Sequence, residues 1–374
     1  MTEVNLESKN ILMILNRYYP MIGGAEQQAR TLARFLRSNF DYNIKVISTD
    51  HLGTLKRLDT LDGNEVHRIS DLKYGMLFFY IKLFFILVFK YKNFKVIHCH
   101  SISVTSFICA ISAKLTKRKC ILKLTISGEI DRLLSGNGVL AKIKSAMIRY
   151  ALNNSTVIAL TKEGKAELNN FGVKEYVQIP NGVDELNVRS GLDVMETTSN
   201  DNRIFGFLGR FCVQKGIPEL LNAFENCNYK SELRLMGSSE HQLSSDIDKV
   251  INSKAETLGS RLTRLEPINP PYEFYKQLTH FVSASKYEGL PNVVLEALSF
   301  GLPCILSDIA PHKEIENACD SPYVKTFDSN EVLISLLDQM PIRQERTSLL
   351  PRKFSMTIVA ESYDNLYKKL FFTP

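Results

Sequence analysis

Short runs of β-branched and apolar residues alternate with helical patterns along nearly all of the 374 residues. A helical pattern is clear in 25–36, where small or apolar residues recur at a helical spacing. Such alternation predicts parallel sheets covered by helices on both faces, an α/β fold. The predicted strands are Ile11–Leu15, Ile44–Ser48, Val96–His100, Ile121–Thr125, Thr156–Leu160, Arg203–Leu208, Glu232–Met236, Thr279–Ser283 and Pro303–Ser307.

The length of the chain favours two domains over one. Five predicted strands precede residue 180 and four follow residue 200, and the segment 187–202 between them has the polar composition of a linker. We therefore expect two doubly wound domains, residues 1–184 and 185–354. Ligands of such sheets bind at the carboxyl ends of the strands, which predicts a site in an interdomain cleft.

The composition is that of a soluble globular protein, with 44% hydrophobic and 23% charged residues. The first seven residues have neither a basic start nor an apolar stretch, so no signal peptide is expected. None of the seven cysteines forms a Cys-x-x-Cys pair. This pattern predicts reduced, buried cysteines and a cytosolic protein.

The charge is unevenly distributed along the chain. Residues 1–185 contain 26 Lys and Arg against 16 Asp and Glu, whereas the remainder contains 20 against 24. The basic half either faces an anionic lipid or substrate or carries ordinary solvated lysines. Basic residues are not interleaved with aromatics in a recognisable motif, which argues against nucleic acid as a partner.

The run 76–89 has fourteen residues, all apolar or aromatic except Lys82. It is too short to span a bilayer, which needs about 20 residues. Two interpretations remain. It forms a helix buried against the first sheet, or it forms a helix partly sunk in a membrane surface, as the flanking Lys73, Lys90, Lys92 and Lys95 would favour.

Two carboxylates, Glu288 and Glu296, flank a predicted strand-to-helix turn with the sequence Gly-Leu-Pro-Asn. Glu296 is the only charge in an apolar run, and a buried lone acid needs fixed donors or a hydroxyl-bearing ligand. The helix start between the two acids offers backbone amides to a phosphate. Together these features predict a sugar-nucleotide site.

Two further loops join a predicted strand to a helix. Gly23 and Gly24 follow the first strand, where paired glycines allow close approach to an anion, although a tight turn alone would also need glycine. Arg210 and Lys215 follow the sixth strand, either as surface cations or to neutralise a departing diphosphate. The absence of Gly-x-Gly-x-x-Gly argues against a nicotinamide enzyme.

Two motifs that resemble metal sites have simpler interpretations. His98 and His100 share a strand face without a third ligand at a metal-site spacing, so no metal is expected. We interpret His98 as a core residue and His100, at the strand end, as a residue of the cleft. Asp246 and Asp248 lie in a polar helical pattern and are interpreted as a solvated helix face.

Taken together, the motifs resemble those of the retaining glycosyltransferases of family 4. These motifs are Gly23-Gly24-x-Glu26, Pro180-Asn181-Gly182-Val183-Asp184, Gly209-Arg210-x4-Lys215-Gly216 and Glu288-x7-Glu296. The resemblance implies the GT-B fold of two Rossmann-like domains. It also implies an acceptor-binding domain over 1–184, a donor-binding domain over 185–354, and a closing helix, 355–374, that returns to the first domain.

The resemblance also implies roles for individual residues. In a catalytic set, Arg210 and Lys215 would clamp the donor diphosphate, and Glu288 would hold a hydroxyl of the transferred sugar. Glu296 would bind the ribose. Backbone groups would complete the donor site at Gly23, Gly24, Leu290, Asn292 and Val293.

The acceptor side departs from the family pattern, because Ser127 replaces a histidine that many relatives place beside the transferred sugar. His100, Ser127 and Glu129 are therefore the acceptor-side candidates. The resemblance implies no metal and no cofactor beyond a nucleoside-diphosphate sugar, with a uridine diphosphate sugar favoured by family frequency.

The resulting expectation is a cytoplasmic, or peripheral inner-membrane, transferase. It would move a hexose to a saccharide acceptor, which is expected to be lipid-linked, in the synthesis of bacterial O-antigen, capsule or exopolysaccharide. The alternatives are a sugar-nucleotide epimerase of the same fold and a non-catalytic partner subunit that only binds the nucleotide sugar. The sugar, nucleotide, acceptor linkage and oligomeric state are not encoded in these motifs.

Overall fold

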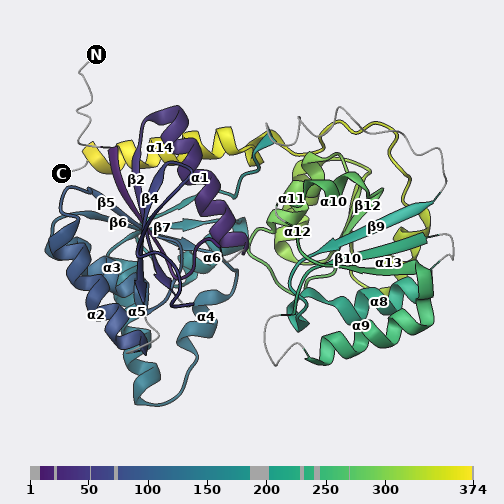
Figure 1. Cartoon of the computed structure of the whole chain (residues 1–374), viewed down its shortest axis with the longest axis horizontal. Helices are drawn as coiled ribbons and strands as arrows, with labels where there is room; N and C mark the ends of the chain where they lie inside the picture. Colours follow the sequence, from purple (N-terminus) through teal and green to yellow (C-terminus); the bar gives the residue numbers. More distant parts are fainter. Residues whose placement is uncertain are drawn as a thin grey trace. The chain divides into compact units, whose positions relative to one another are not determined.

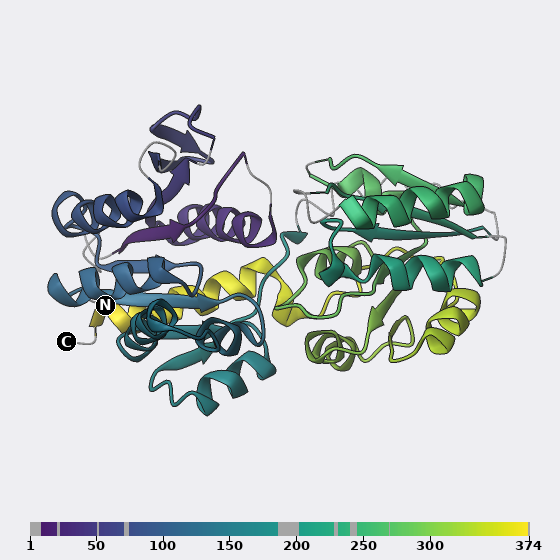
Figure 2. The same cartoon turned by 90° about the horizontal axis from the view of Figure 1, so that it is seen from below.

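The computed structural model describes residues 9–20, 23–50, 52–70, 75–185, 202–227, 231–239, 245–268 and 270–372. The chain divides into two compact units, residues 1–182 with 356–374 (unit 1) and residues 183–355 (unit 2). Figures 1 and 2 show a central sheet with helices in each unit. The predicted linker lies outside the described residues except for its last position.

Unit 1 contains a sheet in the order β3-β4-β2-β1-β5-β6-β7-β8, parallel except for β3. The strands are β1 (Asn10–Leu15), β2 (Asn43–Asp50), β3 (Leu58–Leu61), β4 (Asn64–Ser70), β5 (Val96–Cys99), β6 (Lys119–Leu124), β7 (Thr156–Ala159) and β8 (Tyr176–Gln178). The helices are α1 (Gly24–Phe40), α2 (Gly75–Phe85), α3 (Val104–Leu115), α4 (Glu129–Leu134), α5 (Val139–Asn153), α6 (Lys162–Asn170) and α14 (Met356–Phe372).

The two faces of this sheet are covered by different helices. Alternate strand residues face one apolar cluster with α1 and α14 and another with α2, α3 and α5, so the strands are apolar on both sides. The final helix α14 contacts α1, and the buried Tyr42 hydroxyl donates to Asp364 Oδ1 at 3.0 Å. Residues more than 300 positions apart therefore complete one core (Figure 1).

Unit 2 contains a parallel sheet in the order β11-β10-β9-β12-β13-β14. The strands are β9 (Arg203–Leu208), β10 (Ser231–Met236), β11 (Leu262–Leu265), β12 (His280–Ser283), β13 (Cys304–Ser307) and β14 (Val324–Phe327). The helices are α8 (Ile217–Glu225), α9 (Ser245–Leu258), α10 (Tyr272–Lys276), α11 (Asn292–Ser299), α12 (Ala310–Cys319) and α13 (Asn330–Gln339).

These sheets confirm the predicted α/β fold, and the nine predicted strands are present within two residues at each end. The structure adds β3, β4, β8, β11 and β14, of which all but β4 lie at sheet edges. Edge strands carry few apolar residues and give a weak sequence signal. The hairpin β3–β4 did have a signal, an Asp62-Gly63 turn with positive φ at both residues.

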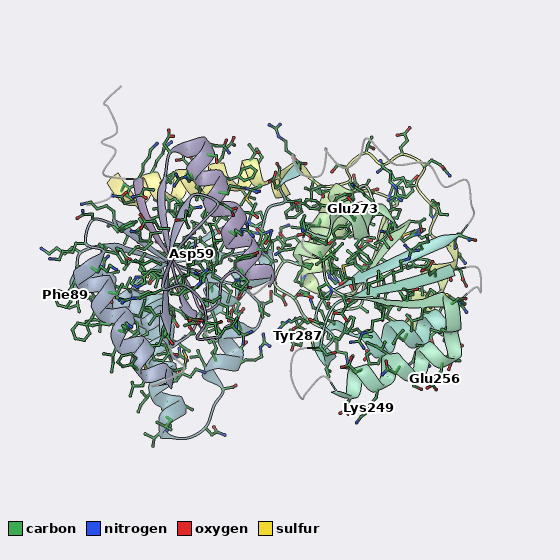
Figure 3. The ribbon with its side chains drawn as sticks, viewed as in Figure 1. Asp59, Phe89, Lys249, Glu256, Glu273 and Tyr287 are labelled. Carbon is green, nitrogen blue, oxygen red and sulfur yellow. The ribbon has the colours of Figure 1, made fainter. Side chains whose placement is uncertain are left out.

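The run 76–89 is buried on one side only. It forms α2 and a π-helical continuation, Ile86–Lys90, whose Phe79, Leu83 and Leu87 are buried in the unit 1 core. Its other side leaves Leu77, Phe85 and Phe89 more than half exposed, and Phe89 points away from the unit in Figure 3. The buried-helix interpretation therefore explains only one face.

The seven cysteines are free, and five of them are buried. Cys212 and Cys319 are partly exposed, so the prediction of buried cysteines is wrong for these two. Cys212 directly precedes the 3-10 turn Val213–Lys215, and Cys319 is the last residue of α12.

The packing of α14 gives a first prediction. Tyr367 is fully buried, its hydroxyl lies 2.8 Å from His98 Nδ1, and its ring meets Tyr42 edge-on at 5.5 Å. Tyr367→Ala should reduce the free energy of unfolding of unit 1 by about 3–5 kcal/mol because it opens an aromatic-sized cavity. Tyr367→Phe should cost about 1–3 kcal/mol because only the His98 partner is lost.

The measurement is urea unfolding followed by circular dichroism. Glu361→Ala, at an exposed position on the same helix, is the control and should change the free energy by less than about 0.5 kcal/mol. Equal midpoints for Tyr367→Ala and the control would show that α14 does not belong to the unit 1 core.

Candidate functional site

In unit 2 the strand order reverses between the neighbouring strands β9 and β12, and the loops that follow these strands meet at one edge of the sheet. Lys215, at the end of a 3-10 turn after β9, lies 2.5 Å from Glu288 Oε1 in the loop after β12. Both side chains are nearly buried, with 14% and 11% exposed. The structure thus brings together two predicted residues that are 73 positions apart.

Backbone contacts fix these two loops against each other. The Lys286 amide donates to the Gln214 carbonyl at 2.8 Å, and the Gln214 side chain donates to the Tyr287 carbonyl at 2.9 Å. Gly216 has φ 63, and a Cβ there would overlap the Ala284 carbonyl oxygen. A side chain at residue 216 would therefore push the loops apart.

Glu296 lies on α11, eight positions after Glu288, and is held by a residue that sequence analysis missed. The Tyr275 hydroxyl donates to Glu296 Oε2 at 2.8 Å, and its fully buried ring stacks on Phe300 at 5.2 Å. Burial raises the pKa of Glu296 to about 7, and the Tyr275 hydrogen bond opposes that shift. No motif identifies Tyr275 in the sequence, because its partner lies 21 residues away.

The remaining donor-side candidates lie around the same loops. Arg210 is exposed in the loop after β9. Leu290 is buried just before α11, and Asn292 and Val293 are its first two residues, where helix amides lack intrahelical acceptors. Sequence analysis also missed the buried His312, whose Nδ1 is hydrogen-bonded to the Ser307 carbonyl. His312 lies near Glu288 and Lys215. Burial lowers the pKa of His312 to about 4, so the ring is neutral.

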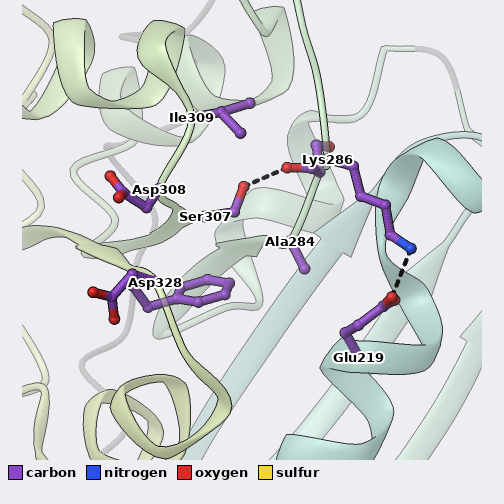
Figure 4. Close-up of a pocket in the computed structure, with 9 residues that line it drawn as sticks. Glu219, Ala284, Lys286, Ser307, Asp308, Ile309 and Asp328 are labelled. Atoms are coloured by element: carbon purple, nitrogen blue, oxygen red, sulfur yellow. Dashed lines mark hydrogen bonds and ion pairs between the residues drawn. The ribbon is translucent and has the colours of Figure 1, made fainter.

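A separate hollow of about 290 Å³ lies at the carboxyl ends of β12, β13 and β14 (Figure 4). Ala284, Ile309 and Phe327 supply apolar surface, and the ion pair between Lys286 and Glu219 crosses one side at 2.7 Å. None of the predicted donor residues lines this hollow.

In unit 1, Gly23 is the N-cap of α1 and Gly24 its first residue. The Glu26 carboxylate folds back over Gly23, so that a Cβ at Gly23 would overlap it. A negative group already lies at this helix start, where anions are favoured. Contact between the two glycines and a diphosphate remains a prediction.

The structure places His100 in the interior of unit 1, only 4% exposed and stacked on His98 with ring centroids 4.1 Å apart. Burial lowers the pKa of His98 to about 3 and shifts the pKa of His100 well below its usual value. Lys123 lies near both rings and donates to Asn181 Oδ1 at 2.9 Å, and burial lowers its pKa to about 7. His98 is a core residue, as predicted, and His100 shares that environment.

Ser127 lies in the turn between β6 and α4, and Glu129 is the first residue of α4. Glu129 Oε2 lies 3.3 Å from both the amide and the hydroxyl of Thr125, and burial raises the pKa of the Glu129 carboxyl. The Ser127 Oγ is buried and has no hydrogen-bond partner within the described structure. The turn therefore presents a hydroxyl and a carboxyl.

The candidates for metal binding are not clustered. Asp246 is 84% exposed and pairs with Lys249, as expected for a solvated helix face. Asp248 is only 28% exposed and pairs with Arg264 of β11, so the interpretation is wrong for this residue. Within the part of the chain that the structure describes, no group of three or more His, Cys, Asp or Glu side chains could hold a metal ion.

Two family models match the chain in sequence order. Residues 22–185 match the model described as Glycosyltransferase Family 4, and residues 202–337 match the model described as Glycosyl transferases group 1. Together they span the greater part of both units.

Similar curated proteins include CapH of Staphylococcus aureus, a capsular polysaccharide biosynthesis glycosyltransferase, 21% identical over 78% of this chain and 80% of CapH. A GDP-mannose:cellobiosyl-diphosphopolyprenol alpha-mannosyltransferase of Xanthomonas oryzae pv. oryzae is 22% identical over 95% and 93% of the two chains. A UDP-Gal:alpha-D-GlcNAc-diphosphoundecaprenol alpha-1,3-galactosyltransferase of Escherichia coli is 29% identical over 59% of each. Other matches are shorter, down to 34% of the relative.

Among solved structures, Anabaena Alr3699/HepE in complex with UDP-glucose superposes with a TM-score of 0.75 at 15% identity. The superposition covers 96% of this chain and 99% of that one. This similarity shows a common fold, GT-B, as predicted.

The buried Glu296 gives a prediction about stability. A carboxyl with a folded pKa near 7 and an unfolded value near 4.5 binds its proton more tightly when folded, so ionisation costs stability as pH rises through this window. Glu296→Gln removes that cost and should stabilise unit 2 by up to about 3 kcal/mol at pH 8, with little gain at pH 5.

Urea unfolding at the two pH values measures the effect. Glu256→Gln, at an exposed position on α9 (Figure 3), is the matched control and should be neutral at both. A gain from Glu296→Gln that does not depend on pH would contradict this account of the carboxyl.

Proposed function

The chain belongs to the glycosyltransferases of family 4 and group 1, and on that premise we propose that it moves a hexose from a nucleoside-diphosphate sugar to a saccharide acceptor with retention of configuration. The observation that supports this most directly is the ion pair between Lys215 and Glu288 at the carboxyl edge of the unit 2 sheet. It combines a cation for a diphosphate with an acceptor for a sugar hydroxyl.

We propose that Arg210 and Lys215 stabilise the negative charge that develops on the diphosphate in the transition state. The bond from the anomeric carbon to the diphosphate breaks while the acceptor oxygen bonds to that carbon on the same face. The leaving diphosphate takes the proton of the incoming hydroxyl, so the protein supplies orientation and charge stabilisation rather than a covalent nucleophile. Lys215 also holds the Glu288 carboxylate in place for the sugar.

We propose that Glu296 binds the ribose hydroxyls. The Tyr275 hydroxyl donates a hydrogen bond to the Glu296 carboxylate and orients it. The backbone at Leu290, Asn292 and Val293 would bind phosphate at the start of α11. With two protein cations for the diphosphate, we propose that the reaction requires no metal ion.

The donor and acceptor classes are proposed from the relatives. A uridine diphosphate sugar is favoured because one relative is named for UDP-galactose and a structure of the same fold holds UDP-glucose. Two relatives are named for sugars on diphosphopolyprenol or diphosphoundecaprenol, which supports a lipid-linked saccharide acceptor. Synthesis of a bacterial surface polysaccharide is the corresponding process.

We propose that unit 1 reaches such an acceptor at an anionic membrane surface. Leu77 and Phe85 on α2 and Leu140 on α5 are 72%, 54% and 83% exposed. The ranges 75–95 and 132–149 contain eight lysines and arginines and no acidic residue, although Lys73 lies outside the described structure. Exposed apolar groups among cations suit a lipid surface. Among the described residues, no helix combines the length and apolar character needed to cross a membrane.

Loss of the diphosphate cation tests the catalytic assignment. Lys215→Ala should lower kcat for sugar transfer by about 10²–10³-fold, because the growing charge on the leaving group loses its partner. Transfer is measured with radiolabelled nucleotide sugars and a short-chain lipid-diphosphate N-acetylglucosamine acceptor, with and without EDTA.

Lys286→Ala is the matched control, since Lys286 lies in the loop after β12 but pairs with Glu219. Its turnover should stay within a few-fold of the wild type. Equal turnover for Lys215→Ala would refute the assignment, and a loss of activity in EDTA would refute the metal-free mechanism.

The membrane contact is tested by liposome flotation. The double variant Ile81→Glu with Leu140→Glu should no longer float with vesicles of phosphatidylcholine and phosphatidylglycerol, because both substitutions place carboxylates among lipid headgroups. Val332→Glu, on α13 of unit 2, is the control for an exposed apolar-to-acidic change and should float as the wild type does. Failure of the wild type to float with these vesicles would count against the contact.

A further inference from the structure

Glu167 on α6 is a nearly buried carboxylate, 8% exposed, whose hydrogen-bond donors are backbone amides. Its Oε2 accepts from the Gly128 amide at 2.9 Å, and its Oε1 accepts from the Ile130 amide at 2.8 Å. A buried carboxylate is costly unless it is hydrogen-bonded, and two short charge-assisted bonds meet that need. Both oxygens are therefore committed to one distant turn.

The turn that Glu167 holds leads into α4, and its N-cap residue offers no side chain to cap that helix. Gly128 is the N-cap of α4, has no side chain to accept an amide hydrogen bond, and has φ 72. A Cβ at Gly128 would meet nothing within 4 Å, so the left-handed backbone rather than lack of space explains the glycine. The cap that Ser, Thr, Asp or Asn usually supplies comes here from a residue 39 positions away.

The same turn carries two of the acceptor-side candidates. Ser127 directly precedes the first amide that Glu167 binds, and Glu129 lies between the two amides. Ser127 Oγ is buried and has no partner within the described structure, and buried polar atoms without partners are rare in native proteins. The Ser127 hydroxyl therefore has hydrogen-bonding capacity that the described residues do not use.

We propose that Glu167 is a positioning residue for the reaction: by binding the amides of Gly128 and Ile130, it holds Ser127 and Glu129 in the geometry that meets the saccharide acceptor. This inference rests on the proposed function. Glu167 acts only through the turn, since both of its oxygens are occupied by amides.

A positioning residue and a purely structural cap differ in the quantity that changes when the residue is substituted. A structural cap affects stability alone, whereas a positioning residue changes kcat or the acceptor KM. Affinity for the nucleotide sugar should not change, because the assigned donor carboxylates and cations belong to unit 2.

The central variant is Glu167→Gln, which keeps the shape but offers one acceptor oxygen to two amides, with its NH₂ group facing the other N–H. Glu163→Gln, exposed on the same helix, is the matched control. Hydrogen exchange by mass spectrometry follows peptides that cover 125–134. Transfer kinetics use the short-chain lipid-diphosphate N-acetylglucosamine probe, and calorimetry measures binding of the nucleotide sugar that the wild type uses.

We expect Glu167→Gln to speed exchange in 125–134 and to lower kcat, or kcat/KM for the acceptor, by about 10–100-fold, as misplaced reacting groups do. The affinity for the nucleotide sugar should stay within about two-fold of the wild type, because the proposed donor carboxylates and cations belong to the other unit. A hundred-fold loss of this affinity would instead indicate damage to the whole protein. Glu167→Asp, which retains the charge, should recover part of the activity, and the control should match the wild type in every measurement.

A second variant covers the case in which Glu167→Gln does not fold. Ser127→Ala removes the presented hydroxyl and leaves the cap intact, so it should lower acceptor turnover without changing exchange. Unchanged exchange in Glu167→Gln would show that Glu167 does not hold the turn. Faster exchange with normal kinetics would leave Glu167 as a structural cap and overturn the proposal.

Failure of the proposed function has a different signature. In that case the wild type itself transfers no sugar from any nucleotide sugar in the screen. That result would remove the positioning role proposed for Glu167, even if hydrogen exchange confirmed that Glu167 holds the turn.

Discussion

Lys215 and Glu288 form an ion pair across the point where the strand order of unit 2 reverses. The other features of the proposed donor site depend on the two loops that this pair joins. Backbone hydrogen bonds align the loops, and Gly216 lets them approach until no Cβ fits against Ala284. Because the pair is almost excluded from water, its attraction is less screened than at a surface, and both groups are fixed before a ligand arrives.

The buried carboxyl of Glu296 lowers the stability of the fold when it ionises. Its carboxyl is buried on α11 with a hydrogen bond from Tyr275, which is too little to restore an ordinary pKa. A ligand with hydroxyl groups would donate further hydrogen bonds to this carboxylate. The same reasoning applies to Ser127 in unit 1, whose hydroxyl is buried without a partner. Incomplete hydrogen bonding thus marks both sets of candidates.

In unit 1 the final helix α14 makes the polar interior possible. Tyr367 reaches His98, Tyr363 lies over the same ring, and Lys123 is held by Asn181. Burial keeps both histidines neutral. An interpretation of His100 from its position at a strand end could not anticipate this, because His100 stacks on His98, and the tyrosines that contact His98 lie more than 250 positions further along the chain.

The sequence by itself determined the α/β alternation, the nine interior strands and the motifs at their carboxyl ends, because periodicity and turn residues are local properties. It did not reveal the edge strands, whose apolar pattern is weak, or the partners of each motif. Tyr275, His312 and Glu167 show no common spacing with the residues they interact with, which are Glu296, Glu288 and Gly128. Only the tertiary structure decided these contacts, because they join helices and loops that come together when the sheets form.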